Sequence, residues 1–305
     1  MRGRSEAAAV SSPLINWTEL KDIELVVLKR MHEYAAGAHP SVLQGLGLDF
    51  VGLRDWQAGD RLADIDWAQS TLTNFSPLVS REFEQNTTVS MMIVADTSPS
   101  IRCGIEGISI AKVVARGVAT LSMAGTFFQD KIGLVTLNGQ SRRLAIRPRV
   151  GKNHALHCIE TYESHALEEP AQGSNVRDNL AGMLRRPSLV PVVSDFLFED
   201  AETLIKELGR LGAVHDVFLV MVDCAFAYAF PTLSAGWVEA NDVETGQTRL
   251  LSARELDQLV LDVRLWQDTV VDFADKEGLE LVRIEPGHEH EALSDFLGQR
   301  RLRKR

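Results

Sequence analysis

The chain has 305 residues, 45% of them hydrophobic and 24% charged, with a formal net charge of −10. These proportions are ordinary for a globular protein and exclude a disordered or fibrous chain. Five basic residues lie in the last six positions, 300–305, so the other 27 face 42 acidic residues and give the body a net charge of −15. An acidic body repels phosphate and disfavours nucleic acid as a partner. We expect the basic run to be a solvated tail.

Three cysteines, Cys103, Cys158 and Cys224, stand alone in the sequence. An odd number without a CxxC pair argues against a disulfide framework and against a cysteine zinc knuckle, so buried reduced thiols are the simplest interpretation. The sequence shows no apolar core of signal-peptide length and no run of about 18 apolar residues. We therefore expect a cytoplasmic protein that does not insert into a membrane.

The N-terminal part changes character along its length. Asn16 and Glu19 have the spacing of a capping box, and apolar residues then recur at helical spacing. Gly37 and Pro40 are expected to end this helix. Residues 47–84 hold short apolar stretches broken by glycine, aspartate and proline, which predicts a compact region of loops and strands.

From residue 88 onward, predicted strands alternate with predicted helices. Strands are expected at 89–95, 132–137, 142–146, 189–193, 214–222 and 279–284, with a hairpin at 237–250. Helices are expected at 105–128, 153–160, 176–184, 201–211 and 253–277, with a short one before the tail. This alternation predicts an α/β fold whose mostly parallel sheet is flanked by helices.

Ligand sites in open α/β sheets lie at the carboxyl ends of the strands, and two predicted strand ends carry oxygen ligands. The first holds Asp96, Ser98 and Ser100, which an extended loop would project to one side. The second holds Asp195, directly after the strand at 189–193. Oxygen ligands with one or two carboxylates suit Mg²⁺. In the alternative interpretation, Ser98 or Ser100 only caps the helix that follows.

This arrangement resembles the metal-ion-dependent adhesion site of von Willebrand factor A domains. That site uses a D-x-S-x-S loop, a threonine on a second loop and an aspartate after a later strand. The resemblance implies that Mg²⁺, or another divalent cation, is held by Asp96, Ser98, Ser100 and Asp195, with Ser174 in place of the threonine.

A narrower resemblance comes from the segment before this domain. Its motifs are GLDF at 47–50, LRDW at 53–56, GDR at 59–61 and DIDW at 64–67. They are similar to the signature block that precedes an A-type domain in the DUF58 family, although Trp56 replaces the usual Tyr and Ala63 a frequent Arg. The similarity continues through 81–83, the D-x-S-x-S loop, 194–196 and 244–246.

The family resemblance implies a bacterial protein that works with a MoxR-type AAA+ ATPase, and some short members accompany methanol dehydrogenase maturation. It divides the chain into a flexible tail (1–15), an N-terminal helix and signature segment (16–87), a von Willebrand factor A-like domain (88–297) and a basic tail (298–305). The signature segment combines four charged residues, Arg54, Asp60, Asp64 and Asp66, with two tryptophans, Trp56 and Trp67, that are too large to leave fully exposed. We expect the arginine and the aspartates to form a buried network that clamps the segment to the sheet. A partner-binding surface is the alternative.

Other motifs favour structural roles. His154, His157 and Cys158 have the spacing of a zinc face, but no fourth ligand is evident and a partly exposed helix is the better interpretation. The run at 288–290 is expected to be a surface turn. The sequence has no P-loop and no G-x-S-x-G elbow. A phosphatase of the haloacid dehalogenase type would need a second Asp at the position of Ser98, so the sequence argues against this class of enzyme.

Two functions from different classes remain. The first is a non-enzymatic interaction module whose metal keeps one coordination position for a carboxylate of a partner, with a MoxR-type AAA+ ATPase and a client protein as partners. Such an adaptor would serve protein or metalloenzyme maturation. The alternative is a Mg-dependent hydrolase or phosphatase that uses Asp96 and Asp195. A metal-free scaffold is the third interpretation.

Overall fold

The structure is a computed structural model of the chain. It describes residues 13–38, 48–58, 60, 62–85, 89–105, 107–138, 141–165, 180, 182–198, 200–229, 237–241 and 248–303. The chain forms two compact units. The larger comprises Met1–Met31 with Val89–Arg305, and the smaller comprises His32–Thr88.

The larger unit is built on a six-stranded sheet. Its strands are β3 (Ser90–Asp96), β6 (Lys131–Asn138), β7 (Ser141–Arg149), β8 (Leu189–Ser194), β9 (Asp216–Val222) and β12 (Glu280–Ile284). Their order is β12-β9-β8-β3-β6-β7, and every neighbouring pair is parallel except β6 with β7. The predicted α/β fold with a mostly parallel sheet is therefore confirmed.

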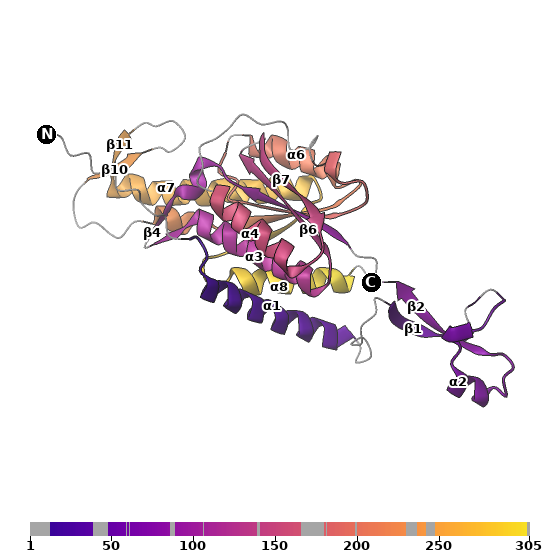
Figure 1. Cartoon of the computed structure of the whole chain (residues 1–305). Coiled ribbons are helices and arrows are strands. Elements are labelled where there is room, and N and C mark those ends of the chain that lie inside the picture. Colours follow the sequence, from indigo (N-terminus) through magenta and orange to yellow (C-terminus); the bar gives the residue numbers. More distant parts are fainter. Residues whose placement is uncertain are drawn as a thin grey trace. The chain divides into compact units, whose positions relative to one another are not determined.

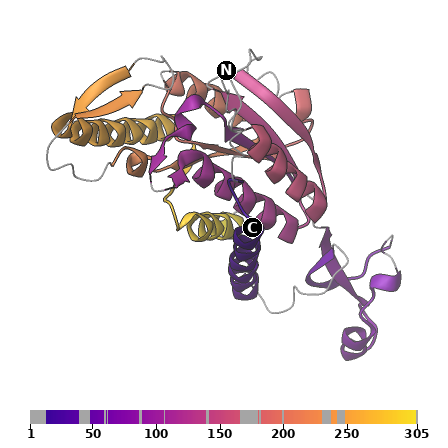
Figure 2. The same cartoon turned by 60° about the vertical axis from the view of Figure 1, so that its left-hand side comes forward.

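Helices cover both faces of this sheet. The longer helices of the chain are α1 (Trp17–Ala38), α3 (Ile110–Phe127), α4 (Lys152–His165), α6 (Ala201–Leu211), α7 (Ala253–Lys276) and α8 (Glu289–Arg303), of which α1 contacts other helices and not the sheet in the described contacts. Helix α3 packs against α4 and α8 on one face, whereas α6 and α7 pack together on the other (Figure 1). Helix α1 runs beside α8 in both views (Figure 1, Figure 2), where Arg30 pairs with Asp295.

Short elements follow the strand ends. They are the 3-10 turns η2 (Pro99–Arg102) and η3 (Ala225–Tyr228), the small hairpin of β4 (Gly104–Ile105) and β5 (Ile108–Ser109), and the hairpin of β10 (Trp237–Asn241) and β11 (Thr248–Ser252). Figure 2 shows the β10–β11 hairpin at the beginning of α7. Helix α3 begins five residues later than predicted because Ser109 accepts a hydrogen bond from Lys112 N and caps it there. Most of the helix predicted at 176–184 lies outside the described residues.

The continuous apolar run of β3 is buried on both faces, as predicted. Met91 to Ala95 are at most 2% exposed. At the N-terminus, the predicted capping box of Asn16 and Glu19 is present, with hydrogen bonds of 3.0 and 2.9 Å. Helix α1 extends past Gly37 to Ala38. No helix in the described part of the chain is both long and apolar enough to cross a membrane.

The prediction of a surface turn at 288–290 is correct for His288, which lies in an exposed turn, but wrong for Glu289 and His290, which begin α8. Glu289 is fully buried at the beginning of α8 and accepts hydrogen bonds from Arg116 (3.2 Å) and from Gly287 N (2.9 Å). The ring of His290 lies 2.8 Å from the Thr120 hydroxyl. Arg116 and Thr120 are on α3, more than 160 residues earlier in the chain, so the local sequence gives no sign of these contacts.

The prediction of a solvated basic tail is also wrong for its first residues. Arg300 is only 7% exposed within α8, where it forms ion pairs with Asp216 and Glu280 and lies 4.8 Å from the ring centre of Phe218. Arg301 pairs with Asp130. These arginines fasten the last turns of α8 to the sheet, because the acidic partners lie at the strand beginnings beneath the helix.

The smaller unit contains an antiparallel hairpin of β1 (Leu48–Asp55) and β2 (Val79–Gln85), the turn η1 (Leu62–Asp64) and the short helix α2 (Trp67–Leu72). Arg54 donates two hydrogen bonds to Asp60, at 2.7 and 2.8 Å. These bonds, with one from Gln57 N, lower the pKa of Asp60 to about 2.

The expectation of a buried network in the signature segment is wrong in two respects. The Arg54 and Asp60 side chains remain 38% and 21% exposed, and Trp67 is 58% exposed. Asp66 instead caps α2 by accepting a hydrogen bond from Gln69 N. The Arg54–Asp60 ion pair and the Asp66 cap therefore stabilise local turns of the smaller unit and do not form a buried network. Gly47, Gly59 and Arg61 of the signature lie outside the described residues.

Candidate metal centre

The two strand ends singled out in the sequence are neighbours in the sheet. Strand β3 ends at Asp96 and β8 ends at Ser194, and the two strands are parallel with Ala95 opposite Val193. Asp96, Ser98, Ser100 and Asp195 are all buried, between 0 and 7% exposed. We call these four residues the rim. Ser174, the predicted fifth ligand, lies outside the described residues.

The serines of the rim do not act as helix caps. Ser98 occupies the N-cap position of η2, but its side chain makes no capping hydrogen bond. Its hydroxyl instead shares a hydrogen bond of 2.9 Å with the Ser100 hydroxyl. The structural alternative, in which Ser98 only caps the following turn, therefore lacks the hydrogen bond on which it depends.

The Asp96 carboxylate organises both strand ends. Its Oδ1 accepts a hydrogen bond of 2.7 Å from Ser98 N, and its Oδ2 accepts one from the Ser194 hydroxyl on the neighbouring strand. Burial raises the pKa of Asp96, and the hydrogen bonds from Ser194 and Ser98 oppose that effect. No lysine, arginine or histidine in the described part of the chain forms an ion pair with Asp96.

The second strand end is held by its own backbone turn. Ser194 Oγ accepts a hydrogen bond from Phe196 N at 2.9 Å, and Asp195 Oδ1 accepts one from Leu197 N at 3.0 Å. Phe196 has a φ of 55°, in the left-handed region. From α7, the Trp266 indole donates to the Phe196 carbonyl at 2.7 Å. Helix α7 thus fixes the turn that carries Asp195.

Tyr162 is a site residue that sequence reasoning missed. It is fully buried on α4 and donates a hydrogen bond of 2.9 Å to the carbonyl oxygen of Asp96. Burial raises its pKa well above the usual range, and the negative charges of Asp96 and Asp195 raise it further. Both carboxylates therefore act on the same phenol. A tyrosine on a helix carries no signal in the sequence that would connect it with a strand end 66 residues earlier.

The donors of the rim fit a small hard cation. The Ser98 and Ser100 hydroxyls are hydrogen-bonded to each other at 2.9 Å, and an octahedral Mg²⁺ with bonds of about 2.1 Å would hold two neighbouring ligands at a similar separation of about 3.0 Å. The carboxylates would supply charge, directly or through water. In the described residues, no group of three His, Cys, Asp or Glu side chains is arranged to hold a metal, so a site here depends on the hydroxyls.

The other candidates do not form a site. Cys158, beside His154 and His157 on α4, is buried, and burial raises its pKa to about 12, which keeps the thiol protonated. Cys224 is also a buried free thiol. Cys103 is only half-buried, which corrects the expectation that all three thiols are buried.

Comparison with known proteins identifies the family. The family described as "Protein of unknown function DUF58" matches residues 52–259. The uncharacterized proteins Mb1516 of Mycobacterium bovis and Rv1480 of Mycobacterium tuberculosis are each 23% identical over 240 residues, which cover 76% of this chain and 72% of theirs.

Similar solved structures include BatB from Bacteroides thetaiotaomicron, with 16% identity and a TM-score of 0.38 over 69% of this chain and 98% of that one. The SpRpn10 VWA domain has 14% identity and a TM-score of 0.37, over 70% and 95% of the two chains. The family match itself spans more than half of this sequence. The chain belongs to the DUF58 family.

Proposed function

We propose that this protein is a non-enzymatic interaction module that binds Mg²⁺, or another divalent cation, at the rim and uses the ion to bind a carboxylate of a partner protein. The observation that carries the proposal is that two buried serine hydroxyls, Ser98 and Ser100, lie beside the fully buried Asp96, whose carboxylate forms no ion pair with a described residue. Burying a carboxylate without a cation is costly, and a bound cation would remove that cost.

The rim residues would hold the ion in two ways, as direct ligands or through water. Ser98 and Ser100 are direct ligands, whereas Asp96, whose oxygens already accept hydrogen bonds from Ser98 N and Ser194, acts through water. Asp195 and Ser174 complete the site directly or through water. Mg²⁺ held by few protein charges retains exchangeable positions. An Asp or Glu side chain of another protein is the natural donor for one of them.

The alternative of a hydrolase or phosphatase is less well supported by the geometry. If Asp96 acted as a nucleophile and not only around Mg²⁺, it would need an accessible oxygen, but the side chain is fully buried and both oxygens accept hydrogen bonds. In the described part of the chain, no histidine, lysine or arginine hydrogen-bonds to a side chain of Asp96, Ser98 or Ser100, so none of these side chains is positioned there as a general acid or base. Sustained hydrolysis of p-nitrophenyl phosphate with Mg²⁺ or Mn²⁺ that Asp96→Ala abolishes would favour the enzyme.

The partners follow from the family resemblance. We propose that the protein acts in the cytoplasm with a MoxR-type AAA+ ATPase, and that it presents a client protein to this ATPase during protein or metalloenzyme maturation. The described part of the chain offers no P-loop, so the ATP-driven step would belong to the partner.

A pull-down of the full chain against the ATPase encoded beside it, with and without the client, tests the proposal. We expect the complex to weaken in EDTA and with Asp96→Ala or Ser98→Ala. Ser122→Ala is the matched control, because Ser122 is equally buried on α3 and its hydroxyl has no hydrogen-bond partner in the described residues. A complex that ignores both chelation and the rim substitutions would contradict a metal-mediated contact.

A further inference from the structure

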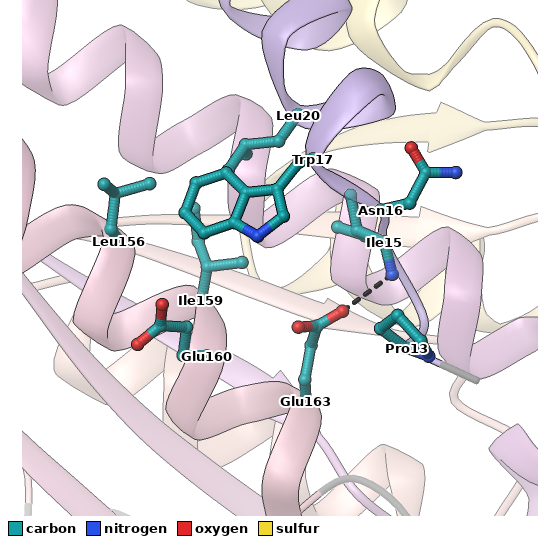
Figure 3. Close-up of a pocket in the computed structure, with 9 residues that line it drawn as sticks. All are labelled: Pro13, Ile15, Asn16, Trp17, Leu20, Leu156, Ile159, Glu160 and Glu163. Atoms are coloured by element: carbon teal, nitrogen blue, oxygen red, sulfur yellow. Dashed lines mark hydrogen bonds between the residues drawn. The ribbon is translucent and has the colours of Figure 1, made fainter. Parts of the chain in front are cut away.

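A cavity of about 180 Å³ lies between the beginning of α1 and one face of α4, within the larger unit (Figure 3). Its apolar wall includes Leu20, Leu156 and Ile159. Figure 3 shows the indole of Trp17 over the side of α4 that carries Ile159. Trp17 is 65% exposed, although tryptophan is among the most apolar and largest side chains. We call this cavity the Trp17 pocket.

Two carboxylates supply the charge of the Trp17 pocket. Glu160 and Glu163 lie one helical turn apart on α4. Glu160 is exposed, and its carboxylate forms no hydrogen bond or ion pair with a described residue. Glu163 Oε1 accepts a hydrogen bond of 2.6 Å from Ile15 N, while its Oε2 accepts none from the described part of the chain.

The lining of the Trp17 pocket contains these two carboxylates and no lysine, arginine or histidine of the described residues. Partial burial raises the pKa of Glu163, and the negative charges of Glu160 and Glu19 raise it further. A cation that entered the pocket would relieve this repulsion. The size of the cavity limits what that cation can be, because sites for drug-sized molecules measure roughly 300–1,000 Å³ and this one is smaller.

We propose that the Trp17 pocket receives an arginine side chain of a partner polypeptide. The methylene groups would pack on Leu20, Leu156 and Ile159, as long basic side chains do on apolar surfaces. The planar guanidinium would stack on the Trp17 indole and donate hydrogen bonds to Glu160 and Glu163. Lysine fits less well, since a compact ammonium cannot stack and donate in parallel to two carboxylates. This inference is independent of a metal at the rim.

The test is an NMR titration of the full chain labelled with ¹⁵N at tryptophan. The Trp17 indole resonance is identified by its loss in Trp17→Phe. The probe is a capped pentapeptide with arginine at its centre, and the comparison peptides carry citrulline or lysine there. We expect a saturable shift of the Trp17 resonance, with affinity at least about fivefold weaker for citrulline, since citrulline is neutral and has a carbonyl acceptor in place of one NH2 donor of the guanidinium.

Variants connect the binding to the pocket. Glu160→Gln should weaken the arginine peptide about fivefold, whereas Glu202→Gln, on the exposed surface of α6, removes the same charge elsewhere and should leave binding unchanged. Because Glu160 is exposed, its substitution should not affect folding. Agmatine, a free small cation, separates a metabolite site from a polypeptide site and should bind more weakly than the peptide.

Four results would overturn the proposal. They are no saturable shift of Trp17, equal binding of the arginine and citrulline peptides, equal binding of the lysine peptide, and tighter binding of agmatine than of the arginine peptide. An equal loss of affinity in Glu160→Gln and Glu202→Gln would count against it as well, because the effect would then be one of net charge.

Discussion

Two fully buried carboxylates in the larger unit have opposite surroundings. Glu289, at the beginning of α8, lies 3.2 Å from the guanidinium of Arg116, which also binds Glu19 at 2.8 Å. Asp96, at the end of β3, is equally buried but forms no ion pair with a described residue, and accepts hydrogen bonds only from a backbone amide and hydroxyl groups.

This difference separates a structural cluster from a candidate site. The charges around Arg116 compensate one another inside the protein, so that cluster needs nothing from outside and holds α1, α3 and α8 together. The charge of Asp96 is spread over hydroxyl dipoles whose oxygens can still act as ligands. Burial of a carboxylate therefore does not by itself indicate a functional site. What distinguishes Glu289 from Asp96 is whether a positively charged side chain of the protein compensates its charge.

The largest expected effect breaks the compensated cluster. Arg116→Met should lower the free energy of unfolding by about 3–5 kcal/mol, because it leaves Glu289 buried without its cation. Urea denaturation measures the loss. Adding Glu289→Gln should restore part of the stability. A loss below about 1 kcal/mol for Arg116→Met alone would mean that water compensates Glu289.

A third buried carboxylate, Asp130, lies between these two cases, because a positive charge compensates it only in part. It is 2% exposed and pairs with Arg301, whose side chain is 40% exposed. Burial raises the pKa of Asp130 from 3.8 to about 6, although the charge of Arg301 lowers it. The folded state therefore binds this proton more tightly than the unfolded chain does.

Relative to Asp130→Asn, the wild type should lose stability as the pH rises from about 4 to about 6, by at most about 3 kcal/mol. Urea denaturation of both proteins at pH 4, 5, 6 and 7 measures the difference. A wild type that gains stability over this range relative to the variant would show that Arg301 compensates Asp130 fully.

Magnesium should act on the rim and not on the Arg116 cluster. At a Mg²⁺ concentration of 100 times its dissociation constant, the wild type should gain about 2.7 kcal/mol of unfolding free energy, and Asp96→Ala should gain none. In EDTA the wild type should remain folded, because the rim lies at the carboxyl ends of β3 and β8 and not in the middle of the sheet. Ser122→Ala should respond to Mg²⁺ like the wild type. A gain that persists in Asp96→Ala would place the ion elsewhere.

The smallest expected effect concerns the positioning of the rim. Tyr162→Phe removes the hydrogen bond to the Asp96 carbonyl and should cost about 1 kcal/mol of stability. Because the loop position changes little, Mg²⁺ affinity should fall only a few-fold, measured by thermal denaturation at several Mg²⁺ concentrations. A loss of Mg²⁺ binding as complete as in Asp96→Ala would make Tyr162 part of the site itself.

The sheet and the two strand ends were predictable from the sequence because they depend on local patterns. The apolar run of β3 ends at Asp96, and the run of β8 ends at Ser194, so parallel pairing brings the two ends together. What lies around them was not predictable. The Ser194 hydroxyl reaches Asp96 across 98 residues of sequence, and the α4 helix places Tyr162 there through packing alone.

The wrong predictions have the same physical origin. Glu289 and Arg300 look like surface residues in the sequence, because their partners on α3 and at the sheet edge lie far away along the chain. The large, apolar Trp67 was expected to be covered, yet it is 58% exposed. Ser174 remains a predicted ligand.

Isothermal titration calorimetry of Mg²⁺ into the metal-free full chain tests the central claim most directly. We predict one ion bound per chain, no measurable binding by Asp96→Ala or Ser98→Ala, and unchanged binding by Ser122→Ala. Equal Mg²⁺ affinity in the wild type and Asp96→Ala would contradict the assignment of the rim as a metal site.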